Sequence, residues 1–94
     1  MNALTHDEIE EHLATAAGWH HRGNAIEKSF DLKDFDGSMR FVNAVAAAAN
    51  AAYHHPDIAI SWNAVTITLT SHDAGGLTER DFSLAKTIDG LIGR

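Results

Sequence analysis

The 94-residue sequence contains no cysteine, which excludes both a disulfide framework and a zinc site built on thiolates. Lys and Arg total only 7 against 13 Asp and Glu, so the clustered positive charge that phosphate binding requires is missing. We therefore expect no direct nucleic-acid ligand. No apolar run approaches the roughly 20 residues of a membrane span, and residues 1–8 lack the basic and apolar segments of a signal peptide. These absences predict a cytoplasmic protein with no membrane partner.

What the sequence does have is a hydrophobic content of 45% and seven histidines. A chain this short cannot build two cores, so one compact domain over residues 1–94 is expected. Histidine is the side chain whose unperturbed pKa, about 6.5, lies near physiological pH. His6 and His12 have no pairing at helical spacing, and His20 and His21, if in a strand, point to opposite faces. We expect these four side chains to be structural or at the surface.

Cap and turn signals divide the first third of the chain into a helix and a hairpin. Thr5 with Glu8 forms a capping box, and the apolar spacing behind it predicts a short amphipathic helix over residues 5–17. Residues 19–32 are typical of a β-hairpin, because Gly23 and the asparagine after it suit a tight turn.

The remaining elements follow from an alanine-rich stretch and two alternating runs. Asp36 is expected to cap a helix over residues 39–52, whose thin alanine face would pack on its own sheet or on a second subunit. Alternation predicts strands over residues 58–62 and 65–70, and a capping signature at Thr78 begins a last helix. The order α-β-β-α-β-β-α predicts a single α+β domain with a four-stranded antiparallel sheet and three helices on one face.

Three histidines of the second half of the chain lie just after a predicted helix or strand. His54 and His55 precede Pro56 between the long helix and the next strand, and His72 follows the last strand. Proline restricts the residue before it to extended geometry, so the pair lies at a rigid junction. Three imidazoles near one cavity could bind a metal, transfer protons to and from a bound molecule, or be structural. Metal binding is disfavoured because adjacent side chains diverge and no carboxylate has a usual ligand spacing.

Several segments closely resemble the pterin-4a-carbinolamine dehydratase family, and with Gly18-Trp19 and residues 34–42 the resemblance covers most of the chain. The segments are His54-His55-Pro56-Asp57-Ile58, Trp62-Asn63-Ala64-Val65 and Leu69-Thr70-Ser71-His72-Asp73-Ala74-Gly75-Gly76-Leu77-Thr78-Glu79-Arg80-Asp81. The family's fold, a four-stranded antiparallel sheet with three helices, agrees with the element order predicted above. The resemblance implies a hydro-lyase that removes water from 4a-hydroxytetrahydropterin to give the quinonoid dihydropterin during tetrahydropterin recycling. No metal and no redox cofactor is implied.

The resemblance also implies roles for individual residues. His54, His55 and His72 would be catalytic, with His72 as the acid that protonates the 4a-hydroxyl and His54 as the base near N5. His55 would also bind and orient the pterin. The residues implied to bind substrate are His54, His55, Pro56, Ser71, His72, Asp73, Ala74 and Asp81.

Two positions of the family pattern need comment. Asp81 matches a family aspartate, and would either orient a histidine or cap the last helix. Many members carry glutamate where this chain has Asn50, and an amide cannot hold the negative charge that favours a protonated neighbouring imidazole.

The implied partners are a reduced pterin, an aromatic amino acid hydroxylase as a functional link, and further copies of the chain in a dimer or tetramer. Some animal relatives also serve as dimerisation cofactors for a transcription factor. An oligomeric scaffold or binding protein with weak or no catalysis is therefore the alternative function, and a metal-binding protein is a third.

Overall fold

The computed structural model describes residues 2–92, so residues 1, 93 and 94 of the predicted domain lie outside the described residues. The predicted element order is confirmed. The elements are α1 (His6–Leu13), β1 (His20–Arg22), β2 (Ala25–Asp31), α2 (Phe35–Ala52), β3 (Asp57–Ser61), β4 (Ala64–Leu69), a 3₁₀ turn η1 (His72–Ala74) and α3 (Glu79–Asp89).

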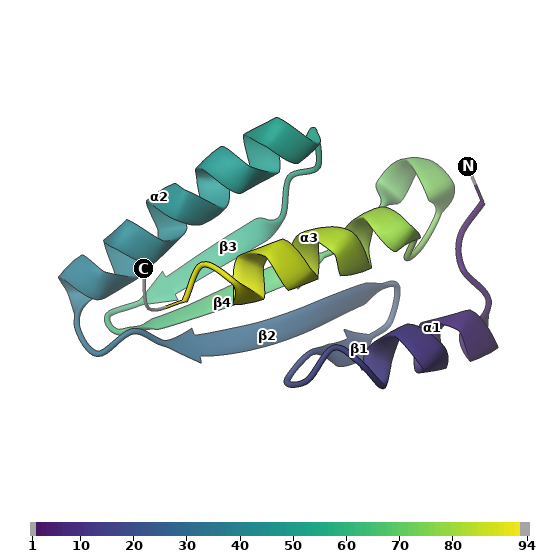
Figure 1. Cartoon of the computed structure of the whole chain (residues 1–94), viewed down its shortest axis with the longest axis horizontal. Helices are drawn as coiled ribbons and strands as arrows, with labels where there is room; N and C mark the ends of the chain where they lie inside the picture. Colours follow the sequence, from purple (N-terminus) through teal and green to yellow (C-terminus); the bar gives the residue numbers. More distant parts are fainter. Residues whose placement is uncertain (1, 93–94) are drawn as a thin grey trace.

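The four strands form one antiparallel sheet in the order β1-β2-β4-β3. The central strands β2 and β4 pair with Ile26 opposite Leu69 and Phe30 opposite Val65, which places these side chains on one face. Both α2 and α3 pack on that face, and α1 lies beside β1 (Figure 1). The three helices and the sheet therefore enclose a single core.

The core follows from the period-two pattern of β4 and the apolar sides of the helices. Val65, Ile67 and Leu69 are fully buried, while the alternate threonines face the other side of the sheet. Phe30 of β2 and Phe41 of α2 pack across the helix–sheet interface with ring centroids 4.8 Å apart and ring planes inclined by 48°. The buried helix residues that complete the core are Ile9, Phe41, Val45, Ala49, Phe82, Leu84, Ala85 and Ile88.

The long helix begins four residues earlier than predicted, and the prediction that Asp36 caps it is wrong. Asp34 is the N-cap, and its Oδ1 accepts a 2.7 Å hydrogen bond from the Gly37 amide. Gly37 makes this start possible, because a Cβ there would lie 2.3 Å from the Leu32 carbonyl oxygen. Asp36 lies within the first turn instead.

Three smaller expectations also change. The first helix ends at Leu13, four residues before the predicted end. Ile60 and Trp62, expected to be half-buried, are 40% and 67% exposed, because β3 is an edge strand and Trp62 lies in the following turn. His12 is half-buried, since its ring stacks on Phe82. Within residues 2–92, no helix has the length and apolar content needed to cross a bilayer.

Candidate active site

The sheet register brings the two histidine-bearing segments to the same end of the sheet. β3 begins at Asp57, directly after Pro56, and Asp57 is paired with Thr68 near the end of β4. The chain then reaches His72 within a few residues, in the turn η1. The junctions that precede β3 and follow β4 are therefore neighbours, although they are far apart along the chain.

His54 is turned into the protein by the way α2 ends. Tyr53 adopts a left-handed conformation with φ of 50°, and the His54 amide then donates back to the Ala49 carbonyl over 3.2 Å. This reversal is the usual C-terminal cap geometry, although glycine commonly occupies the left-handed position. As a result Tyr53 is 87% exposed while His54 is buried.

Asp81 is the hydrogen-bond partner of the buried His54 imidazole. Its Oδ1 lies 2.5 Å from Nε2 of His54, and its Oδ2 accepts hydrogen bonds from the Ser71 hydroxyl and the Thr78 amide at 2.8 and 2.9 Å. Asp81 is completely buried, and the Ser71 and Thr78 hydroxyls are 2.9 Å apart. One carboxylate therefore both contacts a histidine and completes the capping box of α3, the two roles that the sequence leaves as alternatives.

The proton on His54 can be assigned from its partner. A carboxylate only accepts hydrogen bonds, so Nε2 of His54 carries a proton and donates it to Asp81. Within residues 2–92, Nδ1 has no hydrogen-bond partner. This nitrogen is therefore the one that can gain or lose a proton while the ring stays held.

His72 occupies a different environment from His54. It is exposed, and lines a cavity of about 310 Å³ together with Asp57, Thr68 and Thr70 at the ends of β3 and β4. We call this the strand-end cavity. Its other walls come from Asn24, Ala25, Gly75 and Gly76.

His54 lines a second cavity, of about 640 Å³, between α2 and α3, which we call the helix cavity. Its walls include Ala48, Ala51 and Ala52 of α2, and Arg80 and Leu84 of α3. The two histidines thus line separate cavities. No three His, Asp or Glu side chains in the described part of the chain are placed to hold one metal ion.

His55 points away from the buried network. Its side chain is exposed, and its Nε2 lies 3.0 Å from Oδ1 of Asn50, one and a half turns earlier. Because the amide oxygen is an acceptor, Nε2 of His55 is the donor. Asn50 therefore orients His55 without carrying a charge.

The segment that follows β4 is tied back to α3 by an ion pair. Nη2 of Arg80 donates to Oδ1 of Asp73 over 2.6 Å. This hydrogen bond is the main reason that the pKa of Asp73 lies below its ordinary value. Ala74, which follows Asp73, and Pro56 are both half-buried. The described geometry thus joins His54, Asp81 and Ser71 in one network and Asp73 with Arg80 in another.

Comparison with known proteins decides the family. The family model of pterin 4 alpha carbinolamine dehydratase matches residues 2–91. The chain belongs to this family. A relative from Roseiflexus sp. (strain RS-1) is 52% identical, covering 95% of this chain and 96% of its own. One from Sulfurisphaera tokodaii is 47% identical over 98% and 99%. Both are provisionally named pterin-4-alpha-carbinolamine dehydratases.

Two solved structures share the dehydratase fold. A transcriptional coactivator/pterin dehydratase from Brucella melitensis superposes with a TM-score of 0.93 at 34% identity, covering 98% of this chain and all of that one. A pterin dehydratase-like protein, identified as a RuBisCO assembly factor of the α-carboxysome, gives a TM-score of 0.66 at 25% identity, over 80% and 87%. The dehydratase fold is thus found in proteins whose names give them different roles.

Arg80 was assigned no role from the sequence, although in the structure it contacts Asp73 beside His72. It stands in the recognised segment between Thr78 and Asp81, but nothing local shows that it reaches Asp73. The sequence signal for this contact is the pair of opposite charges, Asp73 and Arg80, on either side of a loop that contains two glycines. That signal is weak, because most such pairs are simply solvated.

Proposed function

We propose that this protein is a hydro-lyase that converts 4a-hydroxytetrahydropterin to the quinonoid dihydropterin by histidine acid–base catalysis. The observation that carries the proposal is the buried hydrogen bond of His54 to Asp81, which leaves Nδ1 as the reactive nitrogen. Membership of the pterin dehydratase family supplies the substrate class.

His54 is the proposed base. Elimination of water requires the N5 proton to leave as the 4a-hydroxyl departs, so a group near N5 must accept a proton. With Nε2 bound to Asp81, the imidazole accepts that proton at Nδ1 and becomes an imidazolium ion beside a buried carboxylate. Asp81 stabilises that ion and keeps the ring in the required tautomer, as a carboxylate does for histidine in hydrolase triads.

His72 is the proposed acid. It donates a proton to the 4a-hydroxyl, which leaves as water, while the electrons of the N5–H bond form the new C=N bond. Its ring is exposed at the strand-end cavity, so solvent can restore its proton after each turnover. An imidazole near physiological pH can supply and regain a proton readily.

The remaining residues are proposed to bind the pterin or to support those that do. Because His54 and His72 line different cavities, we propose that the pterin lies across the sheet end between the two segments, where His55, Pro56, Asp73 and Ala74 can contact the flat ring system. Ser71 and Asp81 are buried, with 1% and 0% exposure, so we propose that they act by holding His54 and the loop. No cofactor has a part in this reaction.

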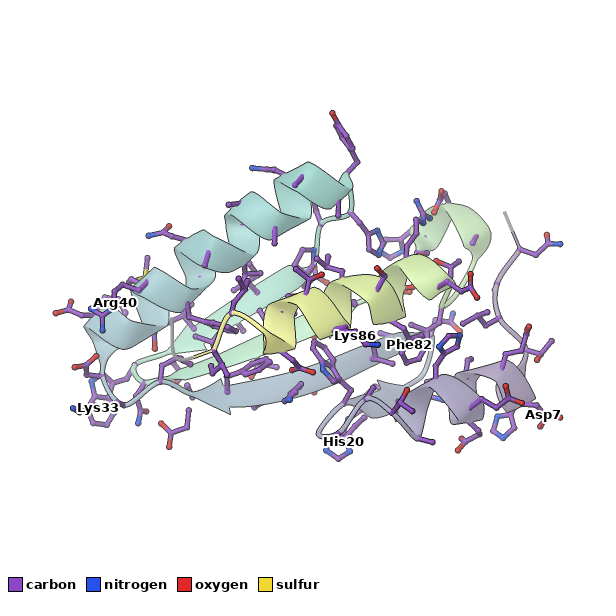
Figure 2. All side chains as sticks on the ribbon, in the orientation of Figure 1. Asp7, His20, Lys33, Arg40, Phe82 and Lys86 are labelled. Atoms are coloured by element: carbon purple, nitrogen blue, oxygen red, sulfur yellow. The ribbon has the colours of Figure 1, made fainter. Side chains whose placement is uncertain are left out.

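Replacement of His72 by alanine tests the mechanism. With enzymatically generated carbinolamine as substrate, His72→Ala is expected to lower kcat by about a hundredfold or more, the usual contribution of a general acid. His20→Ala is the matched control, because His20 is also exposed but lies on β1 (Figure 2). Full activity of His72→Ala, with a normal circular dichroism spectrum, would reject the assignment.

The cellular role that we propose is recycling of a tetrahydropterin cofactor in the cytoplasm, in support of an aromatic amino acid hydroxylase. The support for this role is the family assignment. A hydroxylase assay run at limiting tetrahydropterin is expected to speed up when the protein is added. Addition of His72→Ala in its place should give no such acceleration.

An assembly role is the second candidate function, because the names of two structural neighbours include coactivator and assembly factor. We propose association into a homodimer or tetramer. Exposed Tyr53 and Trp62, at 87% and 67%, and the alanine-lined helix cavity support it. Sedimentation equilibrium checks this, and a monomer that is fully active would count against assembly as the main role.

A further inference from the structure

The loop that carries His72 is closed at its base by polar contacts. Ser71 and Gly76 pair as an isolated β-bridge, and the Ser71 hydroxyl lies 2.9 Å from that of Thr78. Within the loop, the Gly75 amide donates to the His72 carbonyl over 3.1 Å. These contacts hold the two ends of the loop, but none of them involves the His72 side chain.

The tip of the loop is held by one side chain from α3. Nη2 of Arg80 donates to Oδ1 of Asp73, the residue that follows His72. The Nε atom of Arg80 is buried, and is the one such side-chain nitrogen or oxygen without a partner in the described part of the chain. The guanidinium is thus buried at Nε and forms the ion pair through Nη2. A side chain packed in this way is less free to move than a typical surface arginine.

Arg80 and Asp81 are consecutive residues of the first turn of α3, and each holds one of the two segments that carry the histidines. Asp81 contacts His54 from the segment before β3 and also Ser71 at the base of the His72 loop, whereas Arg80 contacts Asp73 at the tip of that loop. A helix turn is rigid, since its backbone is hydrogen-bonded and here capped by Thr78. The relative position of the two segments is therefore determined by a single structural element.

We propose that Arg80 is a positioning residue, which through Asp73 holds the His72 loop in register with His54. The inference rests on the proposed function, because it assumes that His54 and His72 act on one substrate. Arg80 also lines the helix cavity beside His54, and the role proposed for it is its contact with Asp73 and not a contact with the substrate. Two groups that transfer protons within one turnover must keep their separation, and a displacement of about 1 Å can cost up to a hundredfold in rate.

A stabilising role alone predicts a different result. Ion pairs between partly exposed side chains contribute little to folding free energy. Asp73 is 68% exposed and Arg80 34%, so loss of this pair is expected to change the melting temperature little. The effect should appear in kcat and in the mobility of residues 72–75.

The test is a double-mutant cycle measured on carbinolamine dehydration. Arg80→Gln is expected to lower kcat about tenfold while KM stays near its original value, because the catalytic geometry is loosened. Asp73→Asn is expected to lower kcat to the same extent, and also to raise KM, because Asp73 is itself proposed to contact the pterin. The double variant should lose no more than either single one. Arg80→Lys should be intermediate, since it keeps the charge but loses the planar fork.

Two measurements make the test specific. Arg40→Gln is the matched control, because Arg40 is exposed near the start of α2, at the other end of the molecule from η1 (Figure 2). Its kcat should equal that of the unmodified protein. Amide hydrogen exchange at Gly75 should accelerate in Arg80→Gln and Asp73→Asn but not in Arg40→Gln, which reports on the loop independently of activity.

The outcomes separate the two proposals. Unmodified protein that does not dehydrate the carbinolamine rejects the proposed function, and the positioning role falls with it. Active unmodified protein with unchanged kcat in Arg80→Gln rejects only the role of Arg80. Losses that add up in the double variant would also reject it, because they would show that Asp73 acts on the substrate independently of Arg80.

Discussion

His54 and Asp81, 27 residues apart in the sequence, share a buried 2.5 Å hydrogen bond that joins the end of α2 to the start of α3. Helix α3 holds Asp81 in place for this contact, because Oδ2 of Asp81 accepts a hydrogen bond from the Thr78 amide in the capping box. A local feature of a helix start thereby orients a side chain from another element. This relationship makes the capping aspartate part of the site.

Replacement of Asp81 by asparagine should impair catalysis through the tautomer of His54. An asparagine that keeps the cap presents its NH₂ group to Nε2, which must then accept a hydrogen bond and transfer its proton to Nδ1. His54 can then no longer act as a base at Nδ1, and kcat is expected to fall by about a hundredfold. The measurement is kcat at neutral pH, with circular dichroism to verify the fold.

Asp89→Asn is the control for that experiment. Asp89 lies at the other end of α3 and pairs with Lys28 at 2.7 Å and with the Trp19 ring nitrogen at 3.1 Å. This substitution should lower the melting temperature and leave kcat of the folded protein unchanged. A wild-type kcat in Asp81→Asn would contradict the role given to the His54–Asp81 hydrogen bond.

Restoring a carboxylate at position 50 should change the pH dependence of the reaction. In Asn50→Glu, a negative charge near Nε2 of His55 favours the imidazolium form, which then persists to higher pH. Because His55 is proposed to bind the pterin, the limb of the kcat/KM profile that reports on its charge should move upward. The shift should be a fraction of a pH unit, because the site is exposed and screened. Profiles recorded at low and high salt check this, since the shift should shrink at high salt.

Asn50→Gln supplies the uncharged comparison for this experiment. It has the length of glutamate and none of its charge, so its profile should match that of the unmodified protein. Equal shifts in Asn50→Glu and Asn50→Gln would mean that side-chain length, not charge, controls His55.

The start of α2 can be tested by its two candidate caps. Asp34→Ala removes the acceptor of the Gly37 amide and is expected to lower the free energy of unfolding by about 1 kcal/mol. Asp36→Ala removes only a favourable charge in the first turn, worth a few tenths of a kcal/mol. Urea denaturation followed by circular dichroism measures both. Equal losses would contradict the assignment of Asp34 as the cap.

The ion pair of Asp73 should be visible in its titration. The Arg80 hydrogen bond lowers the pKa of Asp73 from its ordinary value of 3.8, so the pair is fully formed above that pH and is lost as the pH falls through the lower value. Carbon NMR of the carboxyl group should give a midpoint below 3.8 in the unmodified protein. In Arg80→Gln the midpoint should return toward the ordinary value of 3.8. An unchanged midpoint would show that Arg80 does not hold the carboxylate in solution.

Features that depend on neighbouring residues were predictable from the sequence. The capping boxes at Thr5 and Thr78 and the alternation of residues 65–69 depend on contacts within a few positions, and the structure has all of them. The hairpin around Gly23 is likewise local. Their chemistry is complete in a short peptide segment, so no knowledge of the rest of the fold is needed.

The errors lie where distant residues compete with local preference. Asp34 and Asp36 are equally good caps by residue type. Asp34 becomes the cap because the end of β2 is fixed by a hydrogen bond from the Leu32 amide to the Asn63 carbonyl. Ile60 is exposed because β3 is at the edge of the sheet, and Trp62 because it lies in the turn after β3; strand order and chain reversal decide both, and alternation does not.

The sequence by itself determined the fold class, the family resemblance and the identity of the candidate histidines, because these depend on residue types in a linear pattern. Only the tertiary structure decided how those histidines are held. The bonds of His54 to Asp81 and of Asp73 to Arg80 join segments whose separation in space depends on strand pairing and helix packing. Hydrogen bonds act over about 3 Å, and that proximity exists only in the folded chain.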